Sequence, residues 1–319
     1  MKISRRSLMT VPLAMLLLGS CAPQKQDERI VLGFSQIGAE SEWRTANTES
    51  IKTAAATMNI DLRFADAQQK QENQIKALRT FIAQKVDVIA FSPVVATGWD
   101  TVLREAKAAG IPVILTDRAV TSDPSLYVGF LGSDFIEEGR KAGRWVSETF
   151  KDTTTDVNIV ELQGTVGSAP ANDRKAGFEE VIAVNPHLKI IRSQSGDFTR
   201  AKGKETMEAI LKSESRKMHV LYAHNDDMAI GAIQAIEEAG YRPGKDIFIV
   251  SIDAVKGAFE AMIAGKLNAT IECNPLLGPQ LMTSVAEVVA GRPIPKRIVV
   301  EETMFTMDTA RQYIQTRKY

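Results

Sequence analysis

The chain has 319 residues, more than a single hydrophobic core usually supports, so we expect two domains. Lys plus Arg and Asp plus Glu both number 39, which makes the formal net charge zero at pH 7. A neutral chain without a basic run excludes the broad basic surface that nucleic acid requires, and we expect no nucleic-acid partner.

The first 21 residues have the features of an export signal. Lys2, Arg5 and Arg6 form a positive n-region, and an apolar segment from Leu8 to Leu18 follows, too short to span a bilayer. The segment ends in Leu-Gly-Ser-Cys (18–21), which resembles a bacterial lipobox. We expect residues 1–21 to form a lipoprotein signal peptide with lipidation at Cys21, and residues 22–28 to form a polar tether.

This segment predicts an exported protein, anchored to the membrane only through lipid and facing the periplasm or the cell exterior. The stretch SRRSL (4–8) also resembles a twin-arginine signal, so the Sec and twin-arginine export routes both stay open. If Cys21 is lipidated, Cys273 is the only other cysteine, which excludes a disulfide within one chain. The three histidines lack paired ligand spacing, and we expect no metal site and no cofactor.

From residue 29 onwards, short apolar runs alternate with helical patterns. The expected strands cover 29–37, 61–67, 86–93 and 111–118 in a first series, and 157–164, 188–196, 218–226, 246–254 and 268–274 in a second. Helical patterns cover 42–58, 72–84, 168–183, 199–212 and 228–239. This alternation predicts an α/β protein with two parallel sheets flanked by helices, divided near residues 131–134. Because no Pro/Gly/Ser-rich linker marks the division, we expect several short crossovers instead of one flexible tether.

Polar residues follow the expected strands at their carboxyl ends, where open α/β sheets bind ligands. They are Gln36, Asp66, Gln68, Ser92, Asp117, Arg118, Gln163, Ser195, Asn225, Asp226, Asp227 and Asp253. Two facing lobes would share these residues across one cleft.

Signatures of the common enzyme classes are absent from the sequence. There is no G-x-G-x-x-G opening a helix after a strand, no G-x-x-x-x-G-K-[ST], and no G-x-S-x-G. Three scattered histidines give little support to a Ser-His-Asp triad. We therefore expect a binding protein and not an enzyme.

Several residue pairs can be read either as ligand groups or as structural ones. Asp117 and Arg118 at a strand end suit hydroxyl recognition, and their alternative is a surface ion pair. Trp43 and Arg44 can cover a sugar face and reach its oxygens, or Trp43 can simply pack on the sheet. For Phe198 an aromatic wall and a staple on the following helix stay equally open.

Arg174 and Asp253 have similar alternatives. Arg174 follows a Gly/Ala-rich loop and can clamp a ligand oxygen, while its neighbour Asp173 either orients it or caps the following helix. Asp253 ends a buried strand, where it can accept hydroxyl bonds or cap the next helix.

The stretch YAHNDDMAI (222–230) places three polar residues after a buried strand. We expect Asn225 to face the ligand, because its amide both donates and accepts. Asp226 is expected to be the N-cap of a helix that begins near Met228, with Asp227 in the first turn.

Taken together, several stretches resemble type I periplasmic sugar-binding proteins of ABC transporters, in the ribose-binding-protein-like group and its galactofuranose-binding branch. They are GFSQIGAESEWRTANT, DAQQKQENQIKALR, SPVVATGWDTVLREAKAAGIPVILTDR, VELQGTVGSAPANDRKAGFEE, IIRSQSGDFTRAKGKE and YAHNDDMAIGAIQAI. The resemblance implies two Rossmann-like lobes joined by a three-crossover hinge, the type I periplasmic binding protein fold. One lobe would hold 29–131 plus about 275–297, and the other 132–274 plus about 298–319.

Position by position, the resemblance implies these ligand-binding residues: Glu40, Ser41, Glu42, Trp43, Arg44, Asp117, Arg118, Arg174, Phe198, Asn225 and Asp253. Glu42 departs from the family pattern, where a small glycine stands. Cys273-Asn274 replaces a position where ribose binders place an amide, which argues against ribose itself.

The resemblance implies a monomeric solute-binding protein that captures a monosaccharide, galactofuranose or a related pentose or hexose, and delivers it to the permease and ATPase subunits of an ABC transporter. A sugar-sensing subunit that presents its ligand to a chemoreceptor or sensor kinase is the alternative. A sugar-responsive repressor is excluded, because a signal peptide occupies the place of its helix-turn-helix. An enzyme with Asp226 and Asp227 as an acid/base pair is the least favoured alternative.

Overall fold

A computed structural model describes residues 29–319 of the chain. The predicted signal peptide, the lipidation at Cys21 and the tether 22–28 lie outside the described residues.

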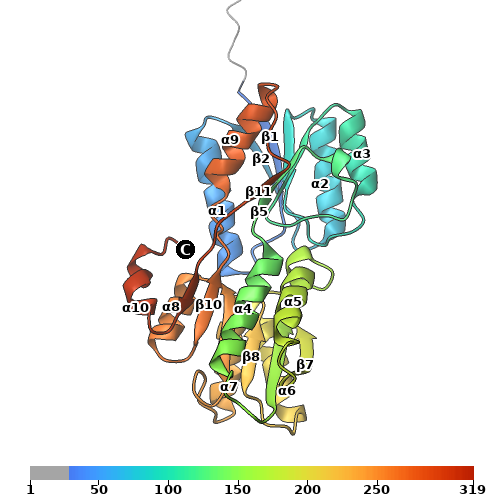
Figure 1. Cartoon of the computed structure of the whole chain (residues 1–319). Coiled ribbons are helices and arrows are strands. Elements are labelled where there is room, and N and C mark those ends of the chain that lie inside the picture. Colours follow the sequence, from blue (N-terminus) through green and yellow to red (C-terminus); the bar gives the residue numbers. More distant parts are fainter. Residues whose placement is uncertain (1–28) are drawn as a thin grey trace, which may run out of the picture.

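The described residues form two six-stranded sheets (Figure 1), one with the strand order β11-β5-β4-β3-β1-β2 and the other with the order β12-β10-β9-β8-β6-β7. The strands of the first sheet are β1 (Val31–Gln36), β2 (Asp61–Asp66), β3 (Val88–Phe91), β4 (Val113–Thr116), β5 (Gly129–Gly132) and β11 (Arg297–Val299). Those of the second are β6 (Val157–Gln163), β7 (Leu188–Ser195), β8 (Val220–Ala223), β9 (Phe248–Asp253), β10 (Ala269–Glu272) and β12 (Met304–Thr306).

Neighbouring strands pair in parallel throughout, except at one edge. There β12 runs antiparallel to β10, with Thr270 opposite Phe305. Parallel sheets were predicted from the sequence, and the strands β5, β11 and β12 were not predicted. An edge strand of three residues, with Met304 exposed, is too short and too solvated to show the continuous apolar run of a buried strand.

Ten α-helices and two 3₁₀ turns cover the sheets in the described part of the chain. They are α1 (Glu42–Thr57), α2 (Gln71–Ala83), α3 (Asp100–Ala108), η1 (Pro124–Leu126), α4 (Phe135–Thr149), α5 (Ala169–Ile182), α6 (Arg200–Ser213), α7 (Asp226–Glu238), α8 (Lys256–Ile263), α9 (Gly278–Val289), α10 (Ala310–Tyr313) and η2 (Ile314–Thr316). Several begin where a short polar side chain accepts a hydrogen bond from a free backbone N–H of the first turn, as Ser41 does for α1 and Asp134 for α4.

We call the first sheet with α1, α2, α3 and α9 the first lobe, and the second sheet with α4 to α8 and α10 the second lobe. Each has its own buried apolar residues: two clusters on the first sheet, around Phe34 and Phe91, and one large cluster in the second lobe around Phe178 and Tyr222. The predicted α/β class with two lobes is confirmed.

The chain passes between the lobes three times, and we call these three crossovers the hinge. They are residues 133–134 between β5 and α4, 273–277 between β10 and α9, and 300–303 between β11 and β12. Three short crossovers allow the lobes to rotate against each other while keeping their register. The hinge implied by the family resemblance is therefore present.

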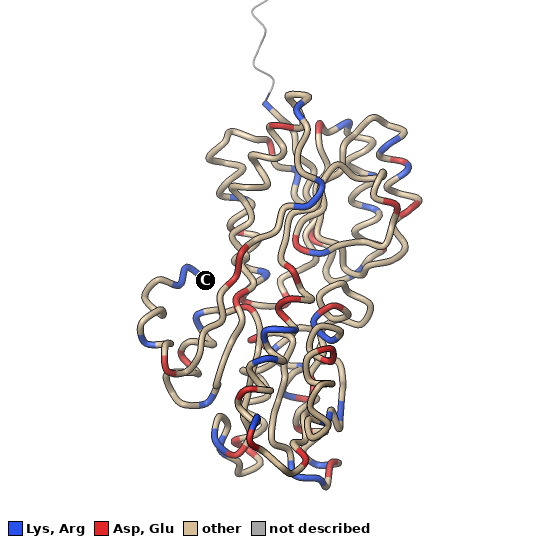
Figure 2. Tube along the Cα trace, in the orientation of Figure 1, with Lys and Arg blue, Asp and Glu red and all other residues tan. Residues whose placement is uncertain are grey.

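Charged residues of both signs are spread over both lobes in the view of Figure 2, in keeping with the zero formal charge. Within residues 29–319, no helix is both long enough and apolar enough to span a membrane.

Candidate functional site

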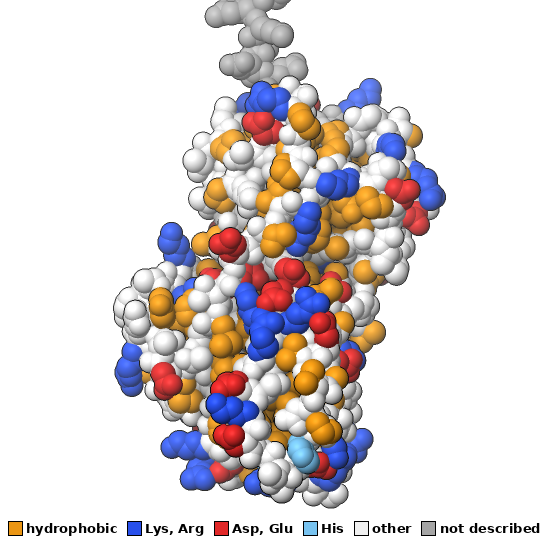
Figure 3. Space-filling view, viewed as in Figure 1, with side chains coloured by type: hydrophobic (Ala, Val, Ile, Leu, Met, Phe, Trp, Pro, Cys, Tyr) orange, Lys and Arg blue, Asp and Glu red, His pale blue; other side chains and the backbone are white. Residues whose placement is uncertain are grey.

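A small hollow lies between the lobes, at the carboxyl ends of both sheets. Its lining comes from both lobes and from the hinge: Glu40, Ser41, Trp43, Arg44, Asp117, Arg118, Phe135, Pro170, Arg174, Phe198, Asn225, Asp253 and Cys273. In the space-filling view, acidic and basic side chains gather at the waist where the lobes meet (Figure 3).

Ten of the eleven ligand-binding residues proposed from the sequence line this hollow, and Glu42 does not. Glu42 lies just outside it, at the start of α1, with Oε2 3.6 Å from Nη2 of Arg200 in the second lobe. The predicted residues thus come together in space, although they are separated by up to two hundred residues in the sequence.

The first lobe contributes a network of buried ion pairs. Nη2 of Arg44 lies 2.7 Å from Oδ2 of Asp117, and Nε of Arg44 lies 3.0 Å from Oε1 of Glu40. The hydroxyl of Ser92 also donates to Asp117 at 2.8 Å. Burial alone would raise the pKa of Asp117, but the guanidinium groups of Arg44 and Arg118 outweigh it and hold the pKa below its usual value. Asp117 is therefore ionised, and the surface ion pair considered as its alternative is wrong, because the residue is only 4% exposed.

Arg118 has fewer partners than Arg44. Its Nη1 donates to the carbonyl of Val94 at 3.0 Å, while its buried Nε makes no hydrogen bond within the described residues and lies 3.8 Å from Oδ2 of Asp117. Burial, together with the neighbouring positive charge of Arg44, lowers the pKa of Arg118 to about 10. A guanidinium at that pKa is still charged at neutral pH, and it keeps a donor for a ligand oxygen.

In the second lobe, Arg174 is fixed from behind. Its Nε lies 2.7 Å from Oε2 of Glu138, and its Nη1 donates to the carbonyl of His224 at 2.5 Å. Nη2 lies 3.7 Å from Oδ1 of Asp253, at the end of β9. Burial raises the pKa of Asp253 well above its usual value. The positive charge of Arg174 lowers this pKa, but the neighbouring acids raise it further, so Arg174 offsets the shift only in part.

Phe198 brings an apolar ring between two cations from different lobes. The ring centre lies 5.2 Å from the guanidinium carbon of Arg118 and 5.8 Å from that of Arg174. Gly164 makes this position possible, since a Cβ there would lie 1.9 Å from the ring. Phe198 thus lines the hollow, where an aromatic wall was expected.

Three residues of the hollow share a left-handed backbone: Asp117 with φ 64°, Phe198 with φ 60° and Asp253 with φ 127°. Such values are uncommon for residues other than glycine, and for a bulky residue such as Phe they are strained. Strain of this kind persists where the surrounding structure dictates it, and it clusters at functional sites. The left-handed backbone turns each chain segment abruptly at a strand end or in the loop beyond it.

Trp43 is held by the hinge and not by the first sheet. Its indole N–H donates to the carbonyl of Cys273 at 2.5 Å, and its ring belongs to the apolar cluster of the second lobe. Packing on the first sheet, the alternative considered for Trp43, is therefore wrong. Because α1 belongs to the first lobe, Trp43 links the two lobes in this conformation.

The structure corrects the roles predicted for Asn225 and Asp226. Helix α7 begins at Asp226, and its N-cap is Asn225, whose Oδ1 accepts from the backbone N–H of Met228 at 3.0 Å. The Nδ2 of Asn225 donates to the carbonyl of Phe198 at 3.1 Å. Asn225 therefore combines two structural bonds with its place in the lining, because the N-cap of α7 lies one residue earlier than the sequence predicted.

Asp226 is a fully buried acceptor and not a cap. It accepts hydrogen bonds from the Thr270 hydroxyl at 2.8 Å, from the Val255 backbone N–H at 2.9 Å and from the Ser251 hydroxyl. These bonds join the start of α7 to β9 and β10. Burial raises the pKa of Asp226 to about 7, even though these donors favour the charged form.

Two other capping alternatives are also wrong. Ser168, and not Asp173, caps α5, because the helix begins at Ala169 and Asp173 lies within it. Helix α8 follows Val255 and has no side-chain cap, so Asp253 does not serve as one.

Phe135, Pro170 and Cys273 line the hollow, but sequence reasoning did not propose them as ligand groups. It also missed Glu138, which fixes Arg174 from behind. Of these residues only Cys273 gave a signal, as a departure from the amide of ribose binders. Phe135 and Glu138 lie in the first turn of α4, whose sequence reads as an ordinary amphipathic helix.

Comparison with known proteins agrees with this geometry. The model of the periplasmic binding protein domain matches residues 32–293. The galactofuranose-binding protein YtfQ of Escherichia coli (strain K12) is 48% identical over 293 residues, which cover 91% of this chain and 92% of that protein.

Two crystal structures are similar over nearly the whole chain. One, from Mycobacterium smegmatis in complex with β-D-fucofuranose, is 56% identical with a TM-score of 0.89 and covers 91% of this chain and 95% of that chain. The other is the binding protein of the arabinose ABC transporter from Shewanella sp. ANA-3, bound to L-arabinofuranose, which is 50% identical with a TM-score of 0.86 and covers 90% of this chain and 95% of that chain.

These relatives are solute-binding proteins and not enzymes, as the sequence predicted. Together with the two lobes, the three-crossover hinge and the hollow between them, they settle the family. The chain belongs to the periplasmic binding proteins, as an exported sugar-binding protein of the ABC-transporter type.

Proposed function

We propose that the chain captures a monosaccharide in its furanose form, galactofuranose or a related pentose or hexose, between two closing lobes and delivers it to a membrane permease. The observation that carries the proposal is the make-up of the hollow. Carboxylates and guanidiniums that can form paired hydrogen bonds come from both lobes, and the Phe198 ring covers one side.

Contacts from both lobes give the ligand a higher affinity for the closed form than for the open one, which is what a closing mechanism requires. Ten of the eleven predicted ligand-binding residues line the same hollow, which supports their role as ligand groups. The two similar structures described above contain furanose sugars, which supports a furanose ligand. As part of the same proposal, lipid on Cys21 would tether the chain to the membrane as a monomer.

A panel of sugars tests the ligand class. We expect galactofuranose, fucofuranose and L-arabinose to raise the melting temperature of the purified chain by mass action, and ribose and glucose to raise it less. Calorimetry then gives the affinities. A preference for a pyranose-only sugar, or no binding to the whole panel, would contradict the proposal.

Two further experiments separate its other parts. If Cys21 carries the anchor, Cys21→Ser should move the protein from the membrane fraction to the soluble fraction without changing sugar affinity. If the role is transport, a deletion strain should lose growth on the sugar. Normal growth with lost sugar-induced transcription would instead support the sensing alternative.

A further inference from the structure

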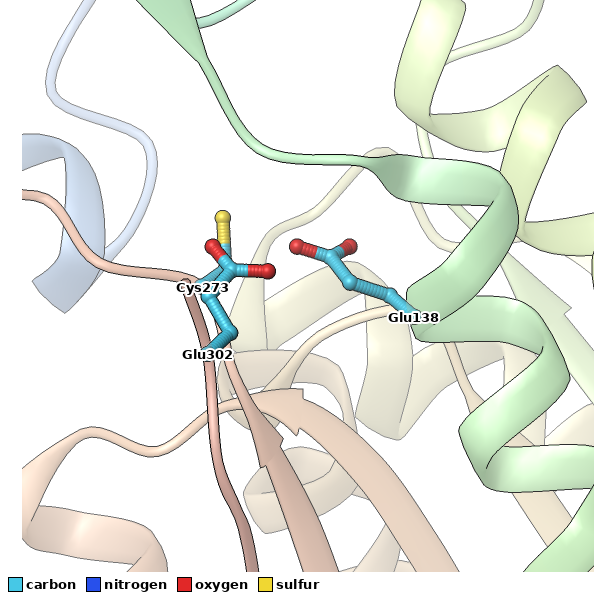
Figure 4. Close-up of side chains that lie close together, drawn as sticks. All are labelled: Glu138, Cys273 and Glu302. Atoms are coloured by element: carbon cyan, nitrogen blue, oxygen red, sulfur yellow. The ribbon is translucent and has the colours of Figure 1, made fainter. Parts of the chain in front are cut away.

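Three residues of metal-ligand type meet at the hinge, two of them buried and Glu302 partly buried, and no metal has been assigned to them so far. Glu138, Cys273 and Glu302 each offer one ligand atom, and these atoms all lie within 4.8 Å of one another (Figure 4). Each residue lies on or next to a different crossover. Glu138 is in the first turn of α4, Cys273 follows β10, and Glu302 lies between β11 and β12.

The Glu138 carboxylate is held by one oxygen and leaves the other for the cluster. Its Oε2 lies 2.7 Å from Nε of Arg174, whereas its Oε1 has no partner although the side chain is fully buried. In Figure 4 this carboxylate points toward Cys273 and Glu302. A buried carboxylate oxygen without a donor is costly, so its environment favours a proton or a cation between Glu138 and its neighbours.

The other two residues are also oriented by neighbours. Oε1 of Glu302 accepts from the Ser133 hydroxyl and from the backbone N–H of Asn274 at 3.2 Å. The Ser133 hydroxyl lies 3.4 Å from Sγ of Cys273, which is 2% exposed. Hydrogen bonds of this kind, around the ligands but not to the metal, are what fix ligand orientation in metal sites.

The donor set indicates which cation suits the cluster. One thiolate and two carboxylates favour a borderline-soft ion such as Zn²⁺ over Mg²⁺ or Ca²⁺, which prefer oxygen alone. Two carboxylates and a thiolate carry three negative charges, and Arg174 supplies one positive charge. A divalent cation therefore brings these four residues to neutrality, which a buried site requires.

The geometry needs only a small adjustment. With metal–ligand bonds of about 2.0–2.3 Å, tetrahedral ligand atoms lie roughly 3.3–3.8 Å apart, so the cluster would contract by about 1 Å. Rotation of the two flexible glutamate side chains covers that distance. Three protein ligands leave the fourth position to water, as in open zinc sites.

We propose that Glu138, Cys273 and Glu302 bind one zinc-class divalent cation, which ties the three crossovers of the hinge together. No metal site was expected from the sequence, because no ligands with metal-site spacing lie close together in it. These ligands are brought together only by the topology of the hinge. The proposal does not depend on which sugar the chain binds.

Cobalt and zinc titrations of the purified, reduced full chain test the proposal. We expect one Co²⁺ per chain to give the absorption band of a thiolate–cobalt bond, and Zn²⁺ to displace it. Mg²⁺ and Ca²⁺ at millimolar concentration should leave the band unchanged. Zinc should also raise the melting temperature.

Variants assign the site. Cys273→Ser should abolish the cobalt band and Glu302→Gln should weaken zinc binding at least tenfold, because each removes a ligand while keeping the side-chain shape. The matched controls are Cys21→Ser, the other cysteine, and Glu301→Gln, the exposed neighbour of Glu302; both should bind metal as the unmodified chain does.

Three results would overturn the inference. They are no cobalt band with the unmodified chain, a band that persists in Cys273→Ser, or zinc affinity unchanged in Glu302→Gln. The last two would place bound metal elsewhere on the chain. If Cys273→Ser does not fold, Glu302→Gln alone still decides the question.

Discussion

The two walls of the hollow are built differently. On the first lobe, charged side chains bind mainly one another: Arg44 lies between Glu40 and Asp117, and Asp117 also contacts Arg118 at 3.8 Å. On the second lobe there is one close buried ion pair, between Arg174 and Glu138, and backbone groups fix the polar side chains as well. Arg174 donates to the carbonyl of His224, and Asn225 both caps α7 and donates to the carbonyl of Phe198.

This difference has an energetic consequence. In a network of buried ion pairs, removal of one member leaves its partner charged and unpaired, so the members should act as one unit. Groups fixed by backbone carbonyls and helix ends keep their positions when a neighbour is removed. We therefore expect strongly coupled effects on the first lobe and nearly independent ones on the second.

Asp117→Ala should have the largest effect on sugar affinity. It leaves Arg44 and Arg118 without their shared carboxylate, and the loss of a buried charged partner typically costs about 2–5 kcal/mol, a weakening of at least tenfold. Calorimetry with the sugar identified in the panel measures it. The matched control, Asp66→Ala, removes an exposed carboxylate at the end of β2 in the same sheet and should leave affinity unchanged.

A double-mutant cycle tests the coupling itself. Arg44→Ala and Asp117→Ala should be non-additive by about 1–3 kcal/mol, whereas Asp117→Ala and Asn225→Ala, on opposite lobes, should add within about 0.5 kcal/mol. Additivity in the first cycle would show that the first lobe is not a coupled network.

The strand ends were predictable from sequence because their chemistry is local. An apolar run followed by Asp117-Arg118, or by Asn225, places a polar group at a sheet edge, and parallel topology brings these edges together. The same local signals predicted the two lobes, since each strand and helix pattern is self-contained.

What could not be predicted are bonds that depend on one residue of register or on distant segments. Assigning the N-cap to Asp226 instead of Asn225 was an error of one position, which the residue types allow because both cap helices well. The position of Glu138 behind Arg174 depends on the packing of α4 against α5, and no pattern within α4 reports it. The convergence of Cys273 and Glu302 likewise depends on the hinge.

Substitutions of Asp226 and Asn225 test the second lobe, and we expect both to change sugar affinity less than Asp117→Ala does. Asp226→Ala leaves two hydroxyls and one N–H unpaired in the core, at a cost of about 1–3 kcal/mol for each such group, so its melting temperature should fall well below that of Asn225→Ala. Asn225→Ala loses a helix cap, about 1 kcal/mol, together with an amide in the hollow.

Thermal unfolding and calorimetry of both variants give the comparison. We expect Asp226→Ala to lower stability more and Asn225→Ala to lower sugar affinity more. The reverse order would mean that Asn225 is purely a cap and that Asp226 shapes the hollow.

The smallest effect concerns the contact that joins the two walls outside the hollow. Oδ2 of Asp227 accepts from the backbone N–H of Glu42 at 2.7 Å, across the lobes, while its Oδ1 lies 2.8 Å from Nη2 of Arg200 within the second lobe. Because the bond to Glu42 forms only when the lobes meet, Asp227→Ala should favour the open form and weaken affinity several-fold, about 1 kcal/mol.

Glu42→Gln is the matched control for this contact. It removes the side-chain charge of Glu42 but keeps the backbone N–H that donates to Asp227. Burial and the nearby Asp227 raise the pKa of Glu42, so its carboxylate adds little attraction, and affinity should stay within about twofold. Small-angle scattering without sugar should show a larger radius of gyration for Asp227→Ala alone. If Glu42→Gln opens the protein as much as Asp227→Ala does, the charge of the Glu42 side chain, and not the backbone bond, holds the lobes together. The two walls would then be joined by ion pairing of the kind that organises the first lobe.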